Sequence, residues 1–407
     1  MMAVAGQQDG RVKQYSEVFP RSTVFVIGGG IGGLAAALAL ARAGHTVTLA
    51  EQAAEFGEVG AGLQLAPNAT RILRDWGLLD AVVHAGVVTE NLVARDAIDG
   101  SVLTVMPLGE AFLARYDAPY VVIHRTDLHQ ILLDACRASA GITLLTGTTI
   151  IDVQTEAQGA TVTAEDGRRA TYPVVIGADG LRSRTRDALV GDAPIPSGYV
   201  AYRGTIPSDG QASNDVTVWM GPGCHLVQYP LRQGTLLNNV VVFKSAGFAR
   251  GDVEYGGVDE LDTVFAGCAE PVQAALAHVG RQRRWPLYDR APAPTWNDGR
   301  IVLTGDAAHP MLQYLAQGAC QALEDADALA RLAPGSKASE WDGAIAGFVA
   351  EREPRASRVQ TTAHAFGDLC HAVGEQRLAR NALLASRARD DFTVADWLWA
   401  DRAPAHL

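Results

Sequence analysis

The sequence predicts an α/β fold, in which a Rossmann-like domain is interrupted by a mostly antiparallel β-sheet and followed by a helical C-terminus. The first observation is a strand–helix–strand unit near the start of the chain. An apolar run at 23–27 leads into glycines, helix-forming residues follow at 34–43, and a second apolar run at 46–50 ends at Glu51. Such a unit commits a domain to a parallel sheet, because parallel strands need a crossover connection.

The second observation is a change of pattern in the middle of the chain. Between residues 198 and 288, turn residues separate the β-rich runs YVAYRGTI, VTVWM, CHLVQYPL and LLNNVVVF, which indicates an antiparallel sheet. One stretch in this region, 258–278, is expected to be helical. An apolar strand at 300–304 then returns to the parallel sheet, followed by a helix from about 317 to 332 and helices over 340–388.

These patterns set the expected domain boundaries. A tail at 1–21 precedes a discontinuous nucleotide-binding domain, made of 22–91, 120–196 and 285–370. The interrupting sheet domain takes 92–119 and 197–284, and a C-terminal segment takes 371–407.

Composition and charge argue against several classes of protein. The net charge of −11 disfavours nucleic acid binding, since phosphate contacts need clustered Lys and Arg. The five cysteines lie far apart without a CxxC pair, which disfavours a disulfide framework and a metal site. The first 22 residues lack the apolar core of a secretory signal, and the longest apolar helical stretch, 31–43, is shorter than the ~20 residues that span a bilayer. We therefore expect a cytoplasmic protein without a membrane span.

A glycine motif marks the candidate nucleotide site. GGGIGG at 28–33 contains the GxGxxG spacing between a strand and a helix. The first glycine permits a tight turn, the second lets a pyrophosphate approach the backbone, and the third lets helix and strand pack closely. Glu51 ends the second strand, where an acid is expected to bind ribose hydroxyls. The motif predicts a dinucleotide but does not distinguish NAD from FAD.

Two later segments resemble motifs of the group A flavin monooxygenases, the family with the p-hydroxybenzoate hydroxylase fold. VVIGADGLRSRTR (174–186) is similar to the family's Asp-Gly motif, and RIVLTGDAAHPMLQYLAQGACQALEDA (300–326) to its Gly-Asp motif and the following helix. The motifs occur in the family's order, and the likeness covers 24–399, including EVGAGLQLAPNA, HRTDL and WPLYDR. The resemblance implies a glutathione-reductase-like domain with bound FAD, transiently bound NADH or NADPH, O2, and a homodimer. The lack of a second GxGxxG agrees, because this family has no separate domain for the reductant.

The resemblance also assigns residues to FAD, each with a simpler alternative. Asp306 would accept hydrogen bonds from the ribityl chain, or it caps a turn or helix. Arg125 would lie near the flavin, or it pairs with Asp127 or Asp134. Asp179 would serve both FAD and the nicotinamide, or Asp-Gly is a plain turn. The predicted cofactor-binding residues are Gly28, Gly30, Ile31, Gly32, Gly33, Glu51, Gln52, Gly62, Leu63, Arg125, Leu128, Asp179, Asp306, Pro310, Gln317, Gly318 and Ala319.

The segment CHLVQYPL (224–231) supplies candidate catalytic residues. Because side chains alternate along a strand, His225, Val227 and Tyr229 project to one face. The resemblance turns that face toward an aromatic substrate, where His225 would accept or relay the phenol proton and Tyr229 would bind the hydroxyl or carboxylate. Without the resemblance, a structural His/Tyr pair is the simpler interpretation. Gln313 would approach the substrate from the flavin side, or stabilise its own loop, and Tyr120 would line the flavin and substrate site.

Within the family, one group of bacterial enzymes is the most similar: those that convert 3-hydroxybenzoate to gentisate (2,5-dihydroxybenzoate). The likeness lies in FGEVGAGLQ, RDAIDGSVLT, SGYVAYRGT, GCHLVQYPL, WPLYDR, DAAHPMLQYLAQGA and TVADWLW. It implies that substrate stimulates reduction of FAD by NAD(P)H, and that a flavin hydroperoxide then hydroxylates the ring para to the phenol. Three other functions stay open: a decarboxylating salicylate-type monooxygenase, a tailoring monooxygenase for a larger aromatic, and a non-enzymatic FAD-binding protein.

Overall fold

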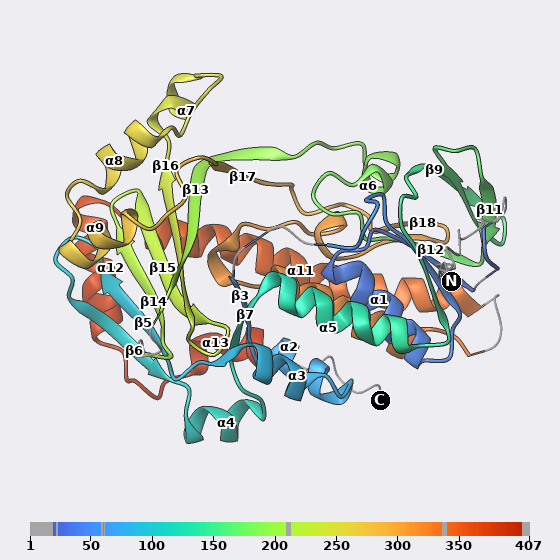
Figure 1. The fold of residues 1–407 in the computed structure, drawn as a ribbon, viewed down its shortest axis with the longest axis horizontal. Coiled ribbons are helices and arrows are strands. Elements are labelled where there is room, and N and C mark those ends of the chain that lie inside the picture. The colour runs from blue at the N-terminus through green and yellow to red at the C-terminus, as the bar shows by residue number, and fades with distance from the viewer. Residues whose placement is uncertain are drawn as a thin grey trace, which may run out of the picture.

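The computed structural model describes residues 19–21, 23–57, 60, 62–208, 213–335 and 340–400, so the predicted tail at 1–21 lies almost wholly outside the described residues. Figure 1 shows two β-sheets toward opposite ends of the long axis, with the long helix α11 (Trp341–Cys370) extending between them. Trp341, at the start of this helix, belongs to the core around the N-terminal sheet. Cys370, at its end, packs with Ala94 and Leu103 of the other sheet.

The N-terminal sheet is parallel, which confirms the prediction from the opening strand–helix–strand pattern. Its strands lie in the order β18-β19-β12-β1-β2-β8, and every pairing is parallel except that of the short edge strand β18. Apolar residues cover both faces, so β1, β2 and β12 are buried throughout. The bounds are β1 (Val24–Ile27), β2 (Val47–Ala50), β8 (Ile142–Leu145), β12 (Val174–Gly177), β18 (Asn297–Asp298) and β19 (Ile301–Leu303).

Helix α1 (Ile31–Arg42) begins three residues earlier than expected. Helix propensity placed its start at residue 34, after the glycines. In the structure Gly33 lies inside the helix and close against the loop, where a Cβ would come within 1.9 Å of the carbonyl oxygen of Gly28. Close packing of the helix on the loop after β1 therefore decides the boundary.

The second large sheet has seven strands in the order β17-β13-β16-β15-β14-β5-β6. Its pairings are antiparallel as predicted, except that β14 and β5 are parallel. This exception arises because the β5–β6 hairpin comes from a distant part of the chain, so no tight turn forces β5 to run opposite to β14. The bounds are β5 (Asn91–Asp96), β6 (Val102–Pro107), β13 (Ile195–Pro207), β14 (Val216–Gly221), β15 (Cys224–Leu231), β16 (Leu236–Lys244) and β17 (Trp285–Asp289).

Two of the expected helical stretches are divided. The stretch at 258–278 forms α8 (Val258–Phe265) and α9 (Glu270–Leu276), because Pro271 has no amide donor and is accommodated only in the first turn of a helix. The C-terminal stretch forms α11 and α12 (Gly374–Ala385), with a break at 371–373. The helix expected from about 317 to 332 is α10 (Gly318–Leu332), which confirms that prediction.

The remaining elements form two small sheets and connecting helices. The strands of the small sheets are β3 (Gly62–Leu65), β4 (Val87–Val88), β7 (Val121–His124), β9 (Ile150–Glu156), β10 (Gly159–Ala164) and β11 (Arg169–Tyr172). The helices are α2 (Pro67–Asp75), α3 (Leu79–Ala85), α4 (Glu110–Tyr116), α5 (Arg125–Ala138), α6 (Arg184–Leu189), α7 (Ala246–Arg250) and α13 (Thr393–Trp399), with the 3-10 turns η1 (Gly305–Ala307) and η2 (Gln313–Leu315). In the described part of the chain, no helix is both long enough and apolar enough to cross a membrane.

Candidate active site

A large cavity connects the two sheets. It has a volume of about 1110 Å³ and extends from the carboxyl end of the parallel sheet to one face of the seven-stranded sheet. The loop after β1 lines one end, and β15 and β16 line the other. The carboxyl ends of parallel strands are the usual nucleotide site of open α/β folds. Sites for one drug-sized ligand have volumes of about 300–1,000 Å³, so this cavity is large enough for a cofactor and a small substrate together.

The glycine loop at the nucleotide end has the geometry of a phosphate cradle. Gly28 has a φ of +105°, a conformation that residues with a side chain rarely adopt. Glu51 lies beside the loop, where its Oε2 accepts a hydrogen bond from the amide of Gly29 at 2.7 Å and its Oε1 accepts one from the amide of Ala53 at 2.8 Å. The loop, the start of α1 and this carboxylate line the same end of the cavity, an arrangement that fits a dinucleotide.

The turn η1 carries Asp306 to the wall of the cavity. The side chain of Asp306 is exposed there, and in the described part of the chain no side chain caps η1 or α10, so the capping alternative gains no support. The turn itself is held by Asp325, whose Oδ2 accepts hydrogen bonds from the amide of Gly305 at 2.9 Å and from Nε2 of His309 at 2.6 Å. Asp325 therefore fixes the backbone from which Asp306 projects.

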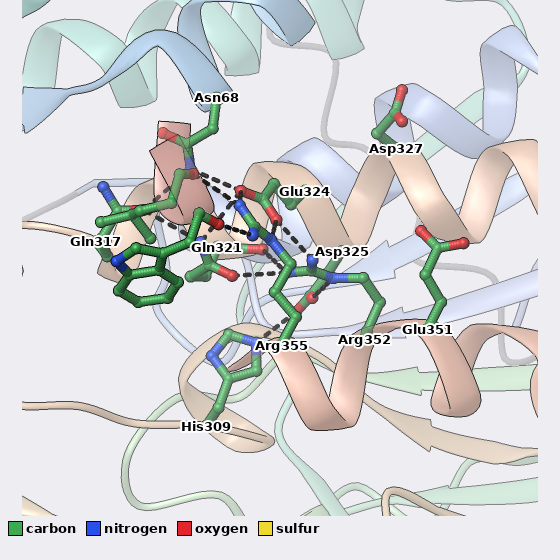
Figure 2. A network of polar contacts seen from close by, with 12 residues as sticks. Asn68, His309, Gln317, Gln321, Glu324, Asp325, Asp327, Glu351, Arg352 and Arg355 are labelled. Carbon is green, nitrogen blue, oxygen red and sulfur yellow. Dashed lines mark hydrogen bonds and ion pairs between the residues drawn. The ribbon is translucent and has the colours of Figure 1, made fainter. Parts of the chain in front are cut away.

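Asp325 belongs to a buried polar network between α10 and α11, which Figure 2 shows. Arg352 on α11 donates from Nε to Asp325 at 2.8 Å and from Nη1 to Glu324 at 2.6 Å. Burial raises the pKa of Asp325, but the interactions with His309 and with the Arg352 guanidinium outweigh burial and hold that pKa below its ordinary value. The carboxylate therefore stays ionised, and it ties α11 to the turn that lines the cavity.

The start of α10 presents backbone amides to the cavity. Gln317, Gly318 and Ala319 all line it. The side chain of Gln317 is fixed by two hydrogen bonds, which its Oε1 accepts from Asn68 at 2.9 Å and from Gln321 at 3.1 Å. The first amides of a helix lack intrahelical partners, so this edge attracts electron-rich groups.

Asp179 lines the cavity but also has local partners. Its carboxylate accepts hydrogen bonds from the hydroxyl of Ser183 at 2.5 Å and from the amide of Thr185 at 3.1 Å. These contacts stabilise the turn before α6, as the plain-turn alternative predicts. They bring the side chain to the cavity wall with part of its hydrogen-bonding capacity already used.

Arg125 is the first residue of α5 and also lines the cavity. The alternative role was an ion pair with one of two nearby acids. In the structure Asp127 pairs with Arg232 at 3.0 Å, and Asp134 pairs with Arg137 at 3.4 Å. Both acids thus have another arginine as partner, which weakens that alternative.

The substrate end of the cavity is built on β15. His225, Val227 and Tyr229 line it, whereas Gln228 turns away and donates a hydrogen bond to Asn239 at 2.8 Å. The alternation of side chains along the strand therefore places the three residues as expected. Burial lowers the pKa of His225 to about 3 and raises the pKa of Tyr229 above its usual range. Both side chains are therefore neutral at neutral pH.

Gln313 lines the cavity from η2 and is oriented by an arginine of the large sheet. Nη2 of Arg203 donates a hydrogen bond to Oε1 of Gln313 at 3.0 Å, which leaves the amide nitrogen of Gln313 to donate elsewhere. This contact comes from another element, unlike the loop-stabilising alternative. Tyr120 lines the cavity from the loop before β7, and its hydroxyl donates to Gln64 at 2.7 Å.

Three predicted site residues do not line the cavity. Gly33 packs under the loop after β1, Leu128 is fully buried in the main core, and Pro310 uses its carbonyl oxygen to accept a hydrogen bond from Gln360. The other predicted site residues all line it.

Two residues of this region, Arg203 and His371, were not predicted from the sequence. Arg203 is a cavity-lining cation for which no carboxylate partner is found among the described residues, and burial lowers its pKa. Its signal was an arginine inside the strand run YVAYRGTI. His371 bonds to His225 from 146 positions away in the sequence, and no pattern around it pointed to this contact.

Comparisons with known proteins agree on one family. A family model described as an FAD binding domain matches residues 21–208. A 3-hydroxybenzoate 6-hydroxylase of Polaromonas naphthalenivorans is 39% identical, over 92% of this chain and 95% of the relative, and one of Klebsiella oxytoca is 37% identical, over 92% and 95%. The crystal structure of Klebsiella pneumoniae HpxO in complex with FAD and uric acid superposes with a TM-score of 0.80 at 26% identity, over 92% of this chain and 95% of that one.

Proposed function

This chain belongs to the group A FAD-dependent aromatic monooxygenases, enzymes that use FAD, NAD(P)H and O2, and from that premise we propose that it hydroxylates 3-hydroxybenzoate to gentisate. One geometric observation carries the proposal. His225, Tyr229 and Gln313 face the same cavity as the glycine loop, so a ring bound among them shares that cavity with the cofactor. The choice of substrate is supported by the two similar sequences, both of which are 3-hydroxybenzoate 6-hydroxylases.

The cofactor end of the cavity fits FAD. The positive φ of Gly28, and the close packing of Gly33 against the carbonyl oxygen of Gly28, shape a loop that suits a pyrophosphate against the start of α1. Glu51 would hold ribose hydroxyls, Asp306 the ribityl chain, and the first amides of α10, at Gly318, the pyrimidine edge. When bound, FAD supplies the acceptance of a hydride from NAD(P)H and the activation of O2.

His225 supplies the base in this proposal. Its burial keeps the imidazole neutral at neutral pH, so one ring nitrogen can accept the phenol proton. Nδ1 bonds to His371, which leaves Nε2 for the substrate. Loss of the phenol proton raises the electron density of the ring, which attack by an electrophilic oxygen requires.

The carboxylate of the substrate needs donors, and three residues that line the cavity provide them. The hydroxyl of Tyr229, the amide nitrogen of Gln313 and the guanidinium of Arg203 all reach the cavity. Arg203 contributes a positive charge at a half-buried position, where attraction to an acid is stronger than in water. These donors favour an aromatic acid over a neutral phenol.

The test is an assay of the FAD-loaded protein with NADH or NADPH, O2 and a panel of hydroxybenzoates. We expect 3-hydroxybenzoate to stimulate oxidation of the reductant and gentisate to be the product. Catechol from salicylate, without turnover of 3-hydroxybenzoate, would show a decarboxylating enzyme instead. Stimulation only by larger aromatics would indicate a tailoring enzyme, and no stimulation by any aromatic would leave a non-enzymatic FAD protein.

The role of His225 has its own control. We expect His225→Ala to keep FAD and to lose about 10²-fold or more in hydroxylation rate, the usual contribution of a general base. Normal hydroxylation by this variant would refute the proton-transfer role and leave the choice of substrate untouched.

We also propose that the protein is a cytoplasmic homodimer with the two domains bounded as the sequence suggests. The five cysteines are unpaired and buried, which suits a reducing compartment. Leu378 on α12 is an exposed apolar side chain of the kind that a subunit contact covers. The domain limits are supported by the separation of the two large sheets.

A further inference from the structure

His225 is hydrogen-bonded to a second buried histidine. The distance from Nδ1 of His225 to Nε2 of His371 is 2.7 Å, and the two rings lie 4.9 Å apart between centroids. His225 comes from β15, whereas His371 follows the last residue of α11. The relative exposure of His225 is 3% and that of His371 is 6%, so water does not compete for this contact.

The surroundings of His371 keep it neutral. The ring of Tyr199 stacks on it at 4.7 Å, and Tyr314 packs edge-on at 5.4 Å. Burial lowers the pKa of His371 to about 2, and the positive charges of Lys244 and Arg380 act in the same direction. His371 is therefore neutral at neutral pH, and one nitrogen of its ring has a lone pair that can accept a hydrogen bond.

One proton lies between two neutral imidazoles that are bonded in this way, and its position decides what His225 can do. If Nδ1 of His225 carries the proton, Nε2 of His225 has a lone pair directed toward the cavity. If Nε2 of His371 carries it, His225 holds its own proton on Nε2 and cannot take one from a phenol. Only the first arrangement gives a base.

We propose that His371 is a positioning residue that accepts the Nδ1 proton of His225, so that Nε2 of His225 is free to take the phenol proton of the substrate. The O–H bond of the phenol breaks and an N–H bond forms on Nε2, which leaves a phenolate and an imidazolium. The imidazolium still donates a hydrogen bond from Nδ1 to His371, and this oriented acceptor stabilises the new positive charge. The inference rests on the proposed function, because it needs a phenolic substrate beside His225.

Two substitutions distinguish the hydrogen-bond acceptor role of His371 from the packing of its ring. His371→Gln can place its Oε1 near the position of Nε2 and accept the same proton, whereas His371→Phe keeps a flat ring and removes the acceptor. Tyr199→Phe is the matched control, since Tyr199 stacks on His371 and the variant loses only a hydroxyl. FAD content and urea unfolding show that each variant is folded.

The readout is the ultraviolet difference spectrum of 3-hydroxybenzoate bound to the FAD-loaded protein, recorded as a function of pH. It gives the pH at which half of the bound phenol is ionised. We expect His371→Phe to raise this midpoint by about one unit or more, a tenfold loss of phenolate at a given pH, and to lower kcat for hydroxylation by about tenfold or more with little change in KM. His371→Gln should recover most of the midpoint shift and most of kcat, and Tyr199→Phe should match the wild type.

Each outcome decides the matter. A wild-type midpoint in His371→Phe overturns the inference, and so does a His371→Gln variant as impaired as His371→Phe, because the acceptor would then not be what matters. His225→Gln distinguishes this failure from failure of the proposed function. If His225→Gln shifts the midpoint and His371→Phe does not, only the role of His371 is wrong. If 3-hydroxybenzoate does not bind or ionise in the wild type, both are wrong.

Discussion

Replacing Asp325 with Asn tests how the structure holds the turn that carries Asp306. The side chain of Asp325 has an exposed fraction of 0% and accepts hydrogen bonds from the turn, from His309 and from Arg352. Removing the charge of one partner in a buried ion pair leaves the other charge uncompensated, which costs about 3–5 kcal/mol of stability. Arg352 keeps its contact with Glu324, so we expect the lower end, about 3 kcal/mol.

Asp327→Asn is the matched control, because it is the same change two residues further along α10. The side chain of Asp327 is 43% exposed, and its ion pair with Arg331 is long at 3.7 Å. Figure 2 shows Asp327 apart from the buried network. A surface pair of this kind contributes less than about 1 kcal/mol. Urea unfolding of both variants, followed by tryptophan fluorescence, measures the difference, and the Kd for FAD should rise only for Asp325→Asn. Equal losses in the two variants, or a loss below about 1 kcal/mol in Asp325→Asn, would show that Asp325 does not hold the turn through its buried ion pair.

Two other predictions follow from single contacts. A Cβ on Gly62 would come within 2.4 Å of the ring of Tyr229, so Gly62→Ala should displace that ring and raise KM for the substrate by about tenfold. Gly57→Ala is the control, because the described residues leave open space around Gly57, and it should change KM less than twofold. Similar KM values for the two variants would contradict the contact. Burial lowers the pKa of His225 to about 3 and of His371 to about 2, below the ordinary 6.5, so the unfolded chain binds more protons between those values. The free energy of unfolding is therefore not reduced by this pair above pH 6.5. It falls as the pH drops below 6.5, by up to about 2.7 kcal/mol per pH unit for two protons. Urea unfolding at a series of pH values checks this, and a double His-to-Gln variant with the same pH dependence as the wild type would show that the pair is not responsible.

The local parts of the site could be predicted from the sequence because their geometry is local. The spacing of the glycines at 28–33 fixes a turn and a helix start, and the period of a strand places His225 and Tyr229 on one face. These features depend on neighbours within a few residues.

The supporting contacts could not be predicted in this way, because they join distant segments. Asp325 meets Arg352 only after α10 and α11 have packed together, and His371 reaches β15 only after α11 has crossed from one sheet toward the other. The parallel pairing of β14 and β5 has the same origin. No local sequence motif around one partner indicates the other partner, so these contacts are set by the tertiary arrangement and not by a sequence pattern.

We propose that one cavity holds FAD at the glycine loop and a hydroxybenzoate between β15 and η2. A crystal structure of the FAD-loaded protein with 3-hydroxybenzoate measures this directly. We expect the phenol oxygen to lie within hydrogen-bond distance of Nε2 of His225, and the carboxylate to bind Tyr229, Gln313 or Arg203. A ring bound elsewhere in the cavity, or one with its carboxylate against His225, would contradict it.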